Sequence, residues 1–444
     1  MRGGGIDLPA QDNQSRRNLK KNVVAQYGLQ FAKYVFPLVT IPYLTRVLGA
    51  EAFGVRAYVL ACMTLAQTFV DFGFNLSATK DIVKARDDRE AIGKIVADVL
   101  LAKVGIVFLV GLCIAGIALF IPILYENPVY LALSFCAVAI NGFLPDYLFM
   151  GIEKMQVLTT RYVGSKTLAL VLMVLLIHSD ADLLLVPIID IASSAVALVW
   201  SWKSATGLKV MFLMKPTISG AIEGFRSSTL YFATNFSASL FNTFATLAIG
   251  AFINNLVAVS YWSLSMSIIN AVQSLYSPMS TALYPHMIAR RDIGLLKSLL
   301  LYSLPILILG TAAILILAKP IMLIAGGDEY SEGAGLLRAL CPILITSFYS
   351  IMLGWPVLGA YERIKEIAIT TVFAGAFLIV ATSIAGIAGL LTIYSAALLR
   401  NLSELILAGT RAWCVKESKI TIIARPDQEA VLDDGAVNPD GKES

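Results

Sequence analysis

Three polar side chains recur at helical spacing inside an otherwise apolar stretch. Gln26, Gln30 and Lys33 follow one another at intervals of four and three residues, so a helix would place them on one face. Lys33 lies twelve residues after Lys21, which is about 18 Å along a helix that rises roughly 1.5 Å per residue. The hydrocarbon core of a bilayer is about 30 Å thick, so this ammonium would lie near the midplane. A charge at that depth must face protein or water and not lipid, and there it could bind an anion.

Two interpretations of Lys33 stay open at this point. Either it lines a wet transport path and binds an anionic ligand, or it forms a salt bridge with Asp71 that only holds two helices together. Pro37 and Pro42 interrupt the same segment. They indicate either a hinged helix or the ordinary tolerance of membrane helices for proline.

The composition indicates which kind of protein must position these residues. Hydrophobic residues make up 57% of the 444-residue chain and charged residues 14%, whereas soluble domains carry about 25% charged residues. The sequence therefore predicts an all-α polytopic membrane protein. The net charge of +4 is spread over short loops, so nucleic-acid binding is not expected.

Few residues suit metal or catalytic chemistry. The five cysteines have no metal-like or disulfide-like spacing, and the two histidines, His178 and His286, lie far apart. The sequence contains no nucleotide-binding loop. We therefore expect no metal, no cofactor and no catalytic residue.

Twelve apolar stretches are long enough to span a membrane. They cover residues 22–46, 56–77, 96–120, 128–150, 160–178, 183–202, 226–250, 257–284, 296–318, 335–358, 365–385 and 387–411. The predicted domain plan is a cytoplasmic N-terminal tail (1–21), an N-terminal six-helix bundle (22–202), a cytoplasmic linker (203–225), a C-terminal six-helix bundle (226–411) and a cytoplasmic C-terminal tail (412–444).

Lysine and arginine are distributed unequally between alternate loops. With the N-terminus in the cytoplasm, 26 of the 34 fall on the cytoplasmic side, four on the opposite side and four inside spans. Because cytoplasmic loops of membrane proteins are enriched in Lys and Arg, this bias predicts that both termini are cytoplasmic and that the number of spans is even.

A weak internal repeat has an offset of 204 residues. It pairs Tyr27 with Tyr231, and Tyr58 with Trp262. The offset corresponds to six spans, so the two halves would have the same orientation. They would be related by an axis along the membrane normal, with a substrate path between them.

Further charges lie inside the predicted spans. The cations are Lys33, Lys103, Lys166 and Arg400, and the acids are Asp71, Asp146, Asp190 and Glu404. The cations are candidates for binding a ligand in a cavity, and Asp71, Asp146 and Asp190 are candidates for coupling to an ion. Arg400 and Glu404 lie four residues apart, so an alternative is that they neutralise each other.

The second half of the chain offers amides in place of charges. Asn235, Asn242 and Gln273 lie in its first two spans. A cavity that is charged on one wall and hydrogen-bonding on the other suits a bulky ligand with one ionic group and many hydroxyls. The alternative is ordinary hydrogen bonding between membrane helices.

Three short runs near the N-terminus resemble a known family. They are residues 42–54 (PYLTRVLGAEAFG), 71–75 (DFGFN) and 78–82 (ATKDI). The sequence resembles the polysaccharide-transport flippases, the Wzx-type O-antigen flippases of the multidrug/oligosaccharidyl-lipid/polysaccharide (MOP) exporter superfamily, most distinctively over residues 18–95. The resemblance implies a bacterial inner-membrane protein with two six-helix bundles in a MATE-like V-shaped arrangement, and a transporter instead of an enzyme.

The resemblance also implies a substrate. The protein would move undecaprenyl-diphosphate-linked oligosaccharide repeats, of O-antigen or a similar polysaccharide, from the cytoplasmic to the periplasmic leaflet by alternating access. The cation-lined cavity of the family matches Lys33, Lys103, Lys166 and Arg400 in this sequence. Partners would be the lipid bilayer, a polysaccharide polymerase and a chain-length regulator.

Other functions compete with this interpretation. A cation-coupled drug or metabolite antiporter of the same superfamily would favour uncompensated acids in the cavity over Lys33. A membrane O-antigen polymerase or glycosyltransferase would need a sizeable periplasmic loop for its catalytic groups. The longest predicted periplasmic loop, residues 319–334, is too small for that purpose.

The predicted topology can be tested with reporter fusions. Fusions at Asp180 and Asp328 should report the periplasm, and fusions at Lys209 and Arg291 the cytoplasm, because loops rich in Lys and Arg stay on the cytoplasmic side. A cytoplasmic signal at Asp328 would contradict the topology.

Overall fold

The structure is a computed structural model that describes residues 8–207 and 215–417, with side chains from residue 22 onward. Every element assigned in these ranges is helical, which confirms the predicted all-α class. The predicted tails and the predicted linker 203–225 lie partly outside the described residues. The helices are α1 (Leu8–Asp71), α2 (Phe74–Lys84), α3 (Arg89–Ala118), α4 (Pro122–Tyr125), α5 (Pro128–Gly142), α6 (Asp146–Gly151), α7 (Met155–Leu176), α8 (Leu185–Thr206), α9 (Ile218–Ala248), α10 (Leu256–Gln273), α11 (Tyr276–Arg290), α12 (Ile293–Gly326), α13 (Ala334–Leu340), α14 (Pro342–Leu353), α15 (Ile364–Ile387) and α16 (Ile393–Glu417), with the short 3-10 helices η1 (Asp180–Leu184) and η3 (Asp328–Gly333) and the π-helical turns η2 (Ile249–Ile253) and η4 (Gly354–Gly359).

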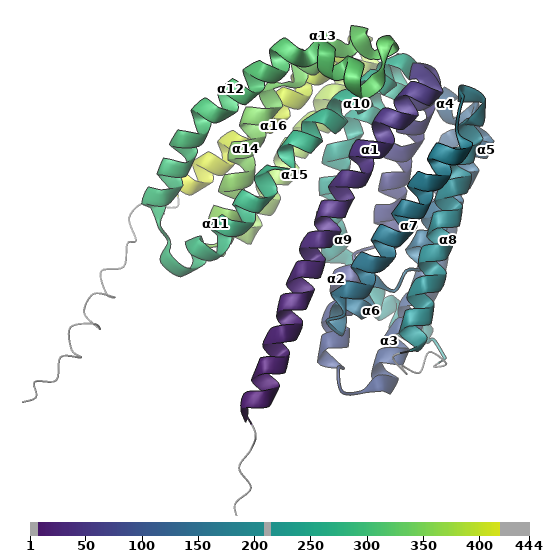
Figure 1. The fold of residues 1–444 in the computed structure, drawn as a ribbon, viewed down its shortest axis with the longest axis vertical. Coiled ribbons are helices and arrows are strands. Elements are labelled where there is room, and N and C mark those ends of the chain that lie inside the picture. Colours follow the sequence, from purple (N-terminus) through teal and green to yellow (C-terminus); the bar gives the residue numbers. More distant parts are fainter. Residues whose placement is uncertain (1–7, 208–214, 418–444) are drawn as a thin grey trace, which may run out of the picture.

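The helices form two lobes arranged as a V (Figure 1). One lobe contains α1–α8 and the other contains α10–α16, and α1 lies along the side of its lobe that faces α10. The lobes meet at the end that carries α13, which we call the closed end, and diverge towards the end where α1 begins, which we call the open end. The MATE-like V implied by the family resemblance is therefore present.

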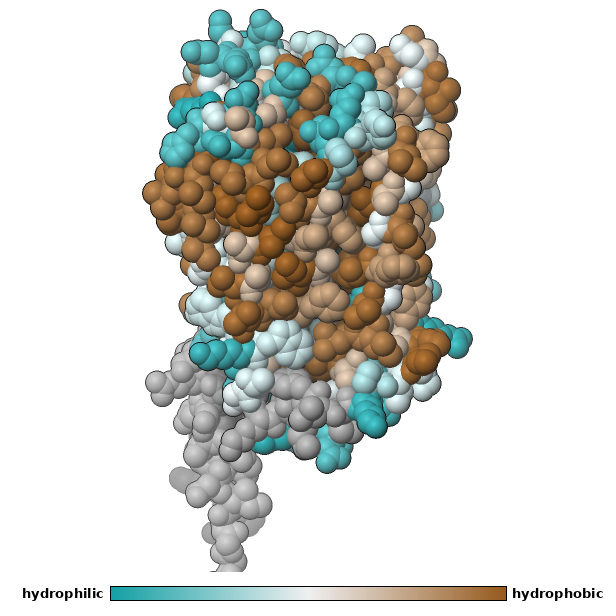
Figure 2. Space-filling view, turned by 90° about the vertical axis from the view of Figure 1, so that its right-hand side faces the viewer, coloured by the Kyte–Doolittle hydropathy of each residue, from teal (hydrophilic) through white to brown (hydrophobic). Residues whose placement is uncertain are grey.

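An apolar band crosses the face of the molecule that Figure 2 presents, and it lies between two hydrophilic ends. Within the described residues, ten helices are long and apolar enough to cross a membrane. One of them, residues 22–84, contains the first two predicted spans, and α16, which matches the twelfth, is not among the ten. The structure is thus consistent with the predicted twelve spans of a multi-pass membrane protein.

A glycine, and not a proline, breaks the first long helix. Gly49 has φ 72° and ψ 177°, and it divides α1 into two segments. The helix continues through Pro37 and Pro42, so neither proline ends it, and the hinge considered at these prolines stays a prediction. A proline removes one backbone hydrogen bond, which membrane helices tolerate, whereas glycine adopts a positive φ without a steric penalty.

Element boundaries recur at the offset of the sequence repeat. α3 begins at Arg89 and α12 begins at Ile293, which is 204 residues later. The break at Gly49 corresponds by the same offset to Ile253, the last residue of η2. This agreement supports two structurally repeated halves, while the axis that relates them stays a prediction.

Helix α9 packs against both lobes. The first half of α9 contains Phe225 and Phe232. The ring of Phe72, which directly follows α1, stacks on these two rings with centroid distances of 4.0 and 4.3 Å. In the second half of α9, Phe241 belongs to a buried cluster with Ala374 of α15. The beginning of the predicted C-terminal bundle is therefore shared between the lobes.

The two halves touch through their main chains near the closed end. A Cβ atom on Gly54 of α1 would lie 2.1 Å from the carbonyl oxygen of Leu256, the first residue of α10. No side chain fits into that space, because real Cβ atoms do not approach other atoms so closely. Gly54 is therefore required for the observed contact between α1 and α10.

We expect Gly54→Ala to destabilise the protein by about 1–3 kcal/mol, the usual range for an overpacked contact. Thermal unfolding of the purified protein in detergent would measure the change. Gly105→Ala is the matched control, since no atom lies within 4 Å of the Cβ position of this helical glycine, and there the substitution should be neutral or stabilising. Equal melting temperatures for the two variants would contradict the close main-chain contact.

Candidate functional site

The candidate site is a groove between the two halves, where α1 passes α10. It has a volume of about 250 Å³. Its lining residues come from α1, α10 and α12, and they are Lys33, Tyr34, Pro37, Leu38, Ile41, Pro42, Leu264, Ser267, Ile268, Asn270, Ala271 and Ala325. Lys33 is the one charged residue in this lining. The groove therefore combines an apolar wall with a single cation.

Lys33 is exposed, and within the described part of the chain it forms no ion pair. Among the described residues, no carboxylate oxygen lies within 4.0 Å of its ammonium group, and Asp71, the partner considered from the sequence, pairs with Lys103 instead. The salt-bridge interpretation of Lys33 with Asp71 is therefore wrong. Since α1 is helical from Leu8 to Gly49, the depth of about 18 Å beyond Lys21 also holds in the structure.

Polar groups of α10 face the same groove. Asn270 is exposed, and Ser267 donates a hydrogen bond to the carbonyl oxygen of Ser263 at 2.7 Å, which leaves its own oxygen free to accept. Asn270 belongs to the polar stripe of the same predicted span as Gln273, whereas Ser267 was not considered from the sequence. Ser263, Ser267 and Asn270 recur at intervals of four and three residues, as Gln26, Gln30 and Lys33 do, so a polar stripe was the signal that could have identified them.

Lys103 lies inside the N-terminal lobe and not in the groove. Its side chain is 1% exposed. Its Nζ atom donates to the carbonyl oxygen of Gly142 at 2.5 Å, lies 3.8 Å from Asp71 and lies 5.6 Å from the ring centre of Tyr147. Gly142 is the last residue of α5, where backbone carbonyls lack helical donors, and Asp71 is the last residue of α1 and offers its side-chain carboxylate. Lys103 thus joins two helix C-termini.

A second ion pair lies near Lys103. Asp146, the first residue of α6, accepts two hydrogen bonds from Arg161 of α7, which also donates to Ser201 at 3.0 Å. Arg161, near the start of the predicted span 160–178, is buried in the structure. Of the three ion-coupling candidates, Asp190 is half-buried and has no cation within 4.0 Å among the described residues.

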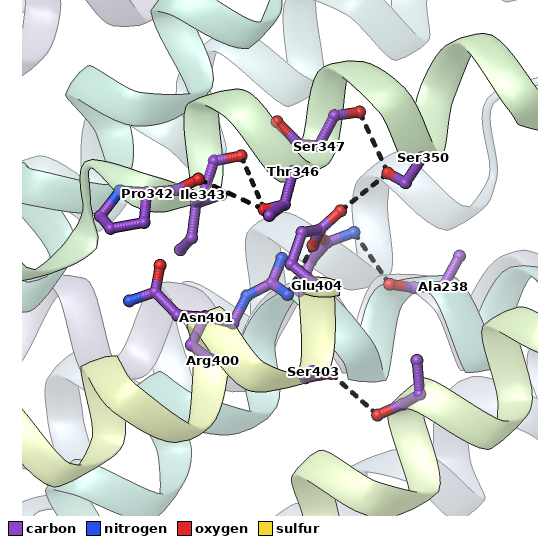
Figure 3. Close-up of polar contacts among 12 residues, drawn as sticks. Ala238, Pro342, Ile343, Thr346, Ser347, Ser350, Arg400, Asn401, Ser403 and Glu404 are labelled. Atoms are coloured by element: carbon purple, nitrogen blue, oxygen red, sulfur yellow. Dashed lines mark hydrogen bonds and ion pairs between the residues drawn. The ribbon is translucent and has the colours of Figure 1, made fainter. Parts of the chain in front are cut away.

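Arg400 belongs to a buried network in the C-terminal lobe (Figure 3). It pairs with Glu404 at 2.8 Å and lies 4.2 Å from the ring centre of Phe241. Ser350 donates to Glu404 at 2.9 Å, and Arg411 donates to the carbonyl oxygen of Ser350 at 2.6 Å. The alternative that Arg400 and Glu404 neutralise each other is confirmed, and in this conformation Arg400 does not reach an open surface.

The remaining predicted site residues are dispersed. Gln26 and Gln30 are exposed on α1, Asn235 and Asn242 are exposed on α9, and Lys166 and Gln273 are half-buried on α7 and α10. None of them is among the lining residues of the α1–α10 groove. Within the described residues, no group of three or more His, Cys, Asp or Glu side chains could hold a metal ion.

A comparison of the sequence with protein-family models assigns the chain to a family. The model described as "Polysaccharide biosynthesis protein" matches residues 19–289. The chain belongs to this polysaccharide biosynthesis family. The family resemblance of the N-terminal runs is thereby confirmed.

Known proteins support the same assignment. A protein of Escherichia coli (strain K12) that is named for O-antigen transport is 27% identical over 375 residues, which cover 82% of this chain and 89% of that protein. The inward-facing structure of a multidrug resistance MATE family transporter of the MOP superfamily superposes with a TM-score of 0.62 at 13% identity, covering 90% of this chain and 99% of the other. The outward-facing structure of such a transporter gives a TM-score of 0.54 at 16% identity, covering 89% and 96%. This member of the polysaccharide biosynthesis family thus has the MOP transporter fold, and its relatives are transporters and not enzymes.

The buried pair of Asp71 and Lys103 gives a stability prediction. Lys103→Met should destabilise the protein by about 3–5 kcal/mol, because it leaves the Asp71 carboxylate without its cation. The double variant Lys103→Met with Asp71→Asn should recover part of this loss, since no unpaired charge remains. Membrane levels and melting temperatures would measure both effects. Lys297→Met, at an exposed lysine of α12, serves as the control, and a double variant no more stable than Lys103→Met would contradict the pairing.

Proposed function

We propose that the protein flips undecaprenyl-diphosphate-linked oligosaccharide repeat units, of O-antigen or a similar polysaccharide, across the bacterial inner membrane by alternating access. The family, the MOP fold and the relative named for O-antigen transport support this proposal. The observation that carries it is Lys33, which lines a groove between the two lobes and has no carboxylate partner among the residues that the structure describes.

The groove has the chemistry that such a substrate needs. A diphosphate is an anion that an ammonium group binds largely as a point charge, and Lys33 offers an ammonium without a competing carboxylate. Asn270 and Ser267 supply an amide and a hydroxyl for sugar hydroxyls on the opposite wall. The apolar remainder of the lining, which includes Leu38 and Ile41, suits the first part of a polyprenyl chain that stays in the bilayer.

The open end of the V would face the cytoplasm. The Lys and Arg distribution in the loops places the N-terminus there, and α1 begins at the open end (Figure 1). The higher TM-score with an inward-facing transporter than with an outward-facing one supports the same assignment. The substrate would enter from the cytoplasmic leaflet and leave on the periplasmic side after the lobes rock.

Ion coupling would use a carboxylate of the N-terminal lobe. Asp71 and Asp146 are engaged by Lys103 and Arg161. Asp190 therefore becomes the leading candidate, since it lacks a cation within 4.0 Å among the described residues. The competing antiporter of cationic drugs or metabolites would need a free acid in the groove, and the groove lining contains none.

Export assays on Lys33 variants test the proposal. In a strain that depends on this protein for surface polysaccharide, Lys33→Ala should abolish export, because no cation remains for the diphosphate. Lys33→Arg should retain part of the export, because it keeps the positive charge. Surface polysaccharide is measured by immunoblot, and the membrane level of each variant is measured alongside.

Purified protein in liposomes gives the direct test. Wild-type protein should transfer an undecaprenyl-diphosphate-linked oligosaccharide between leaflets, whereas Lys33→Ala should not. Lys297→Ala is the control, because Lys297 is an exposed cation that is not among the lining residues of the groove. Full transfer by a stably inserted Lys33→Ala protein would remove Lys33 from the mechanism, and no transfer by the wild type would reject the substrate.

A further inference from the structure

The run Pro42–Gly54, which carries much of the family resemblance, begins at the groove, which Pro42 lines, and continues towards the closed end. Its break at Gly49 leaves the next backbone N–H, that of Ala50, without a helical acceptor. The carboxylate of Glu329, from η3 in the other half of the chain, accepts this N–H at 2.7 Å. An acidic side chain of one half thus caps the N-terminus of a helix segment in the other half, where the helix dipole favours negative charge.

The reverse contact lies beside it. Helix α12 ends at Gly326, so its last carbonyl groups lack helical donors. The Thr45 hydroxyl lies 2.9 Å from the carbonyl oxygen of Ala325 and 2.9 Å from that of Ile41 in its own helix, so it can donate to either. Arg46 donates to the carbonyl oxygen of Ile324. A hydroxyl and a cation of the N-terminal half thus cap the C-terminus of a helix in the C-terminal half.

The position of Glu329 is itself fixed by its neighbours. Tyr261 of α10 donates to the backbone carbonyl of Glu329 at 2.7 Å, and the ring of Tyr330 packs edge-on against Phe53 of α1 at 6.3 Å between centroids. Burial raises the pKa of the Tyr330 hydroxyl, so this group stays neutral beside the carboxylate. Gly49 is also close, since a Cβ atom there would lie 3.2 Å from the Glu329 carboxylate.

We propose that Thr45, Arg46 and Ala50 of α1, together with Ile324, Ala325 and Glu329, form a latch between the lobes. The latch keeps the closed end of the V shut while the groove is open at the other end. It must release when the lobes separate at the closed end, and Glu329 is its main positioning residue. The inference rests on the proposed function only for the direction of transport.

The contacts of the latch suit reversible opening. Arg46 and Glu329 are exposed, so water can reach the capped backbone groups when the contacts break. Each contact joins a side chain of one half to backbone groups of the other, so rotation of the lobes breaks all three without unfolding a helix. The charge on two of the three contacts makes them stronger than ordinary hydrogen bonds.

A cysteine reporter measures the opening directly. The five native cysteines are replaced, and Ala271→Cys is introduced in the groove. A membrane-impermeant maleimide is then applied from the periplasmic side in cells and from the cytoplasmic side in inverted vesicles. Glu329→Gln should raise the periplasmic labelling rate roughly tenfold, because the loss of one charge-assisted hydrogen bond shifts a two-state equilibrium by about that factor. Cytoplasmic labelling should change little, since the latched state stays the major one.

Glu332→Gln is the matched control. Glu332 lies in the same turn η3 and is exposed, but it makes none of the latch contacts. Its periplasmic labelling should equal that of the reporter protein alone. Equal labelling of the Glu329 and Glu332 variants at normal membrane levels would overturn the latch.

A reversible cross-link covers the case in which Glu329→Gln does not insert. Ala50→Cys and Glu329→Cys are joined by a short bis-methanethiosulfonate reagent, which should stop lipid transfer in liposomes, and a reductant should restore it. Transfer at the full rate by cross-linked protein would contradict the latch. If Glu329→Gln raises periplasmic labelling but the wild type transfers no lipid in liposomes, the result would support the latch and reject the proposed substrate.

Discussion

The cost of an unpaired charge in hydrocarbon organises this structure. In the N-terminal lobe, Lys103 is paired with Asp71, and Arg161 with Asp146. In the C-terminal lobe, Arg400 is paired with Glu404. Because these pairs are internally neutral, they hold each lobe together without attracting a ligand. Lys33 differs from these cations because it is exposed, it lines the groove, and no carboxylate oxygen among the described residues lies within 4.0 Å of it.

The sequence was sufficient for the properties that depend on one segment at a time. The apolar stretches, the helical spacing of Gln26, Gln30 and Lys33, and the runs that resemble the family all survive in the structure or in the family match. Partners across segments were harder to predict. The order of spans favoured Lys33 as the partner of Asp71, but α3 brings Lys103 to the end of α1, and this adjacency is set by three-dimensional packing.

Local backbone geometry explains the other differences. The prolines of α1 drew attention because proline is the usual helix breaker, yet the break is at Gly49, whose positive φ leaves no trace in hydropathy. Glu329 looked like an ordinary loop acid, because its function depends on a free N–H that exists only after that break. Sequence periodicity identifies which face of a helix is polar, and it does not identify which backbone groups lack a partner.

The packing of α9 has a consequence for how the two lobes can move. Its first half is attached to the N-terminal lobe through Phe225 and Phe232, and through Thr217, whose N–H donates to Asp98 at 2.6 Å. Its second half is attached to α15 through Phe241. The second sequence repeat therefore begins near the start of α9, whereas the contacts of this helix change from one lobe to the other further along it. Under the proposed alternating access, the two parts of α9 would move with different lobes, so this helix would have to bend or slide against one of them when the V changes shape.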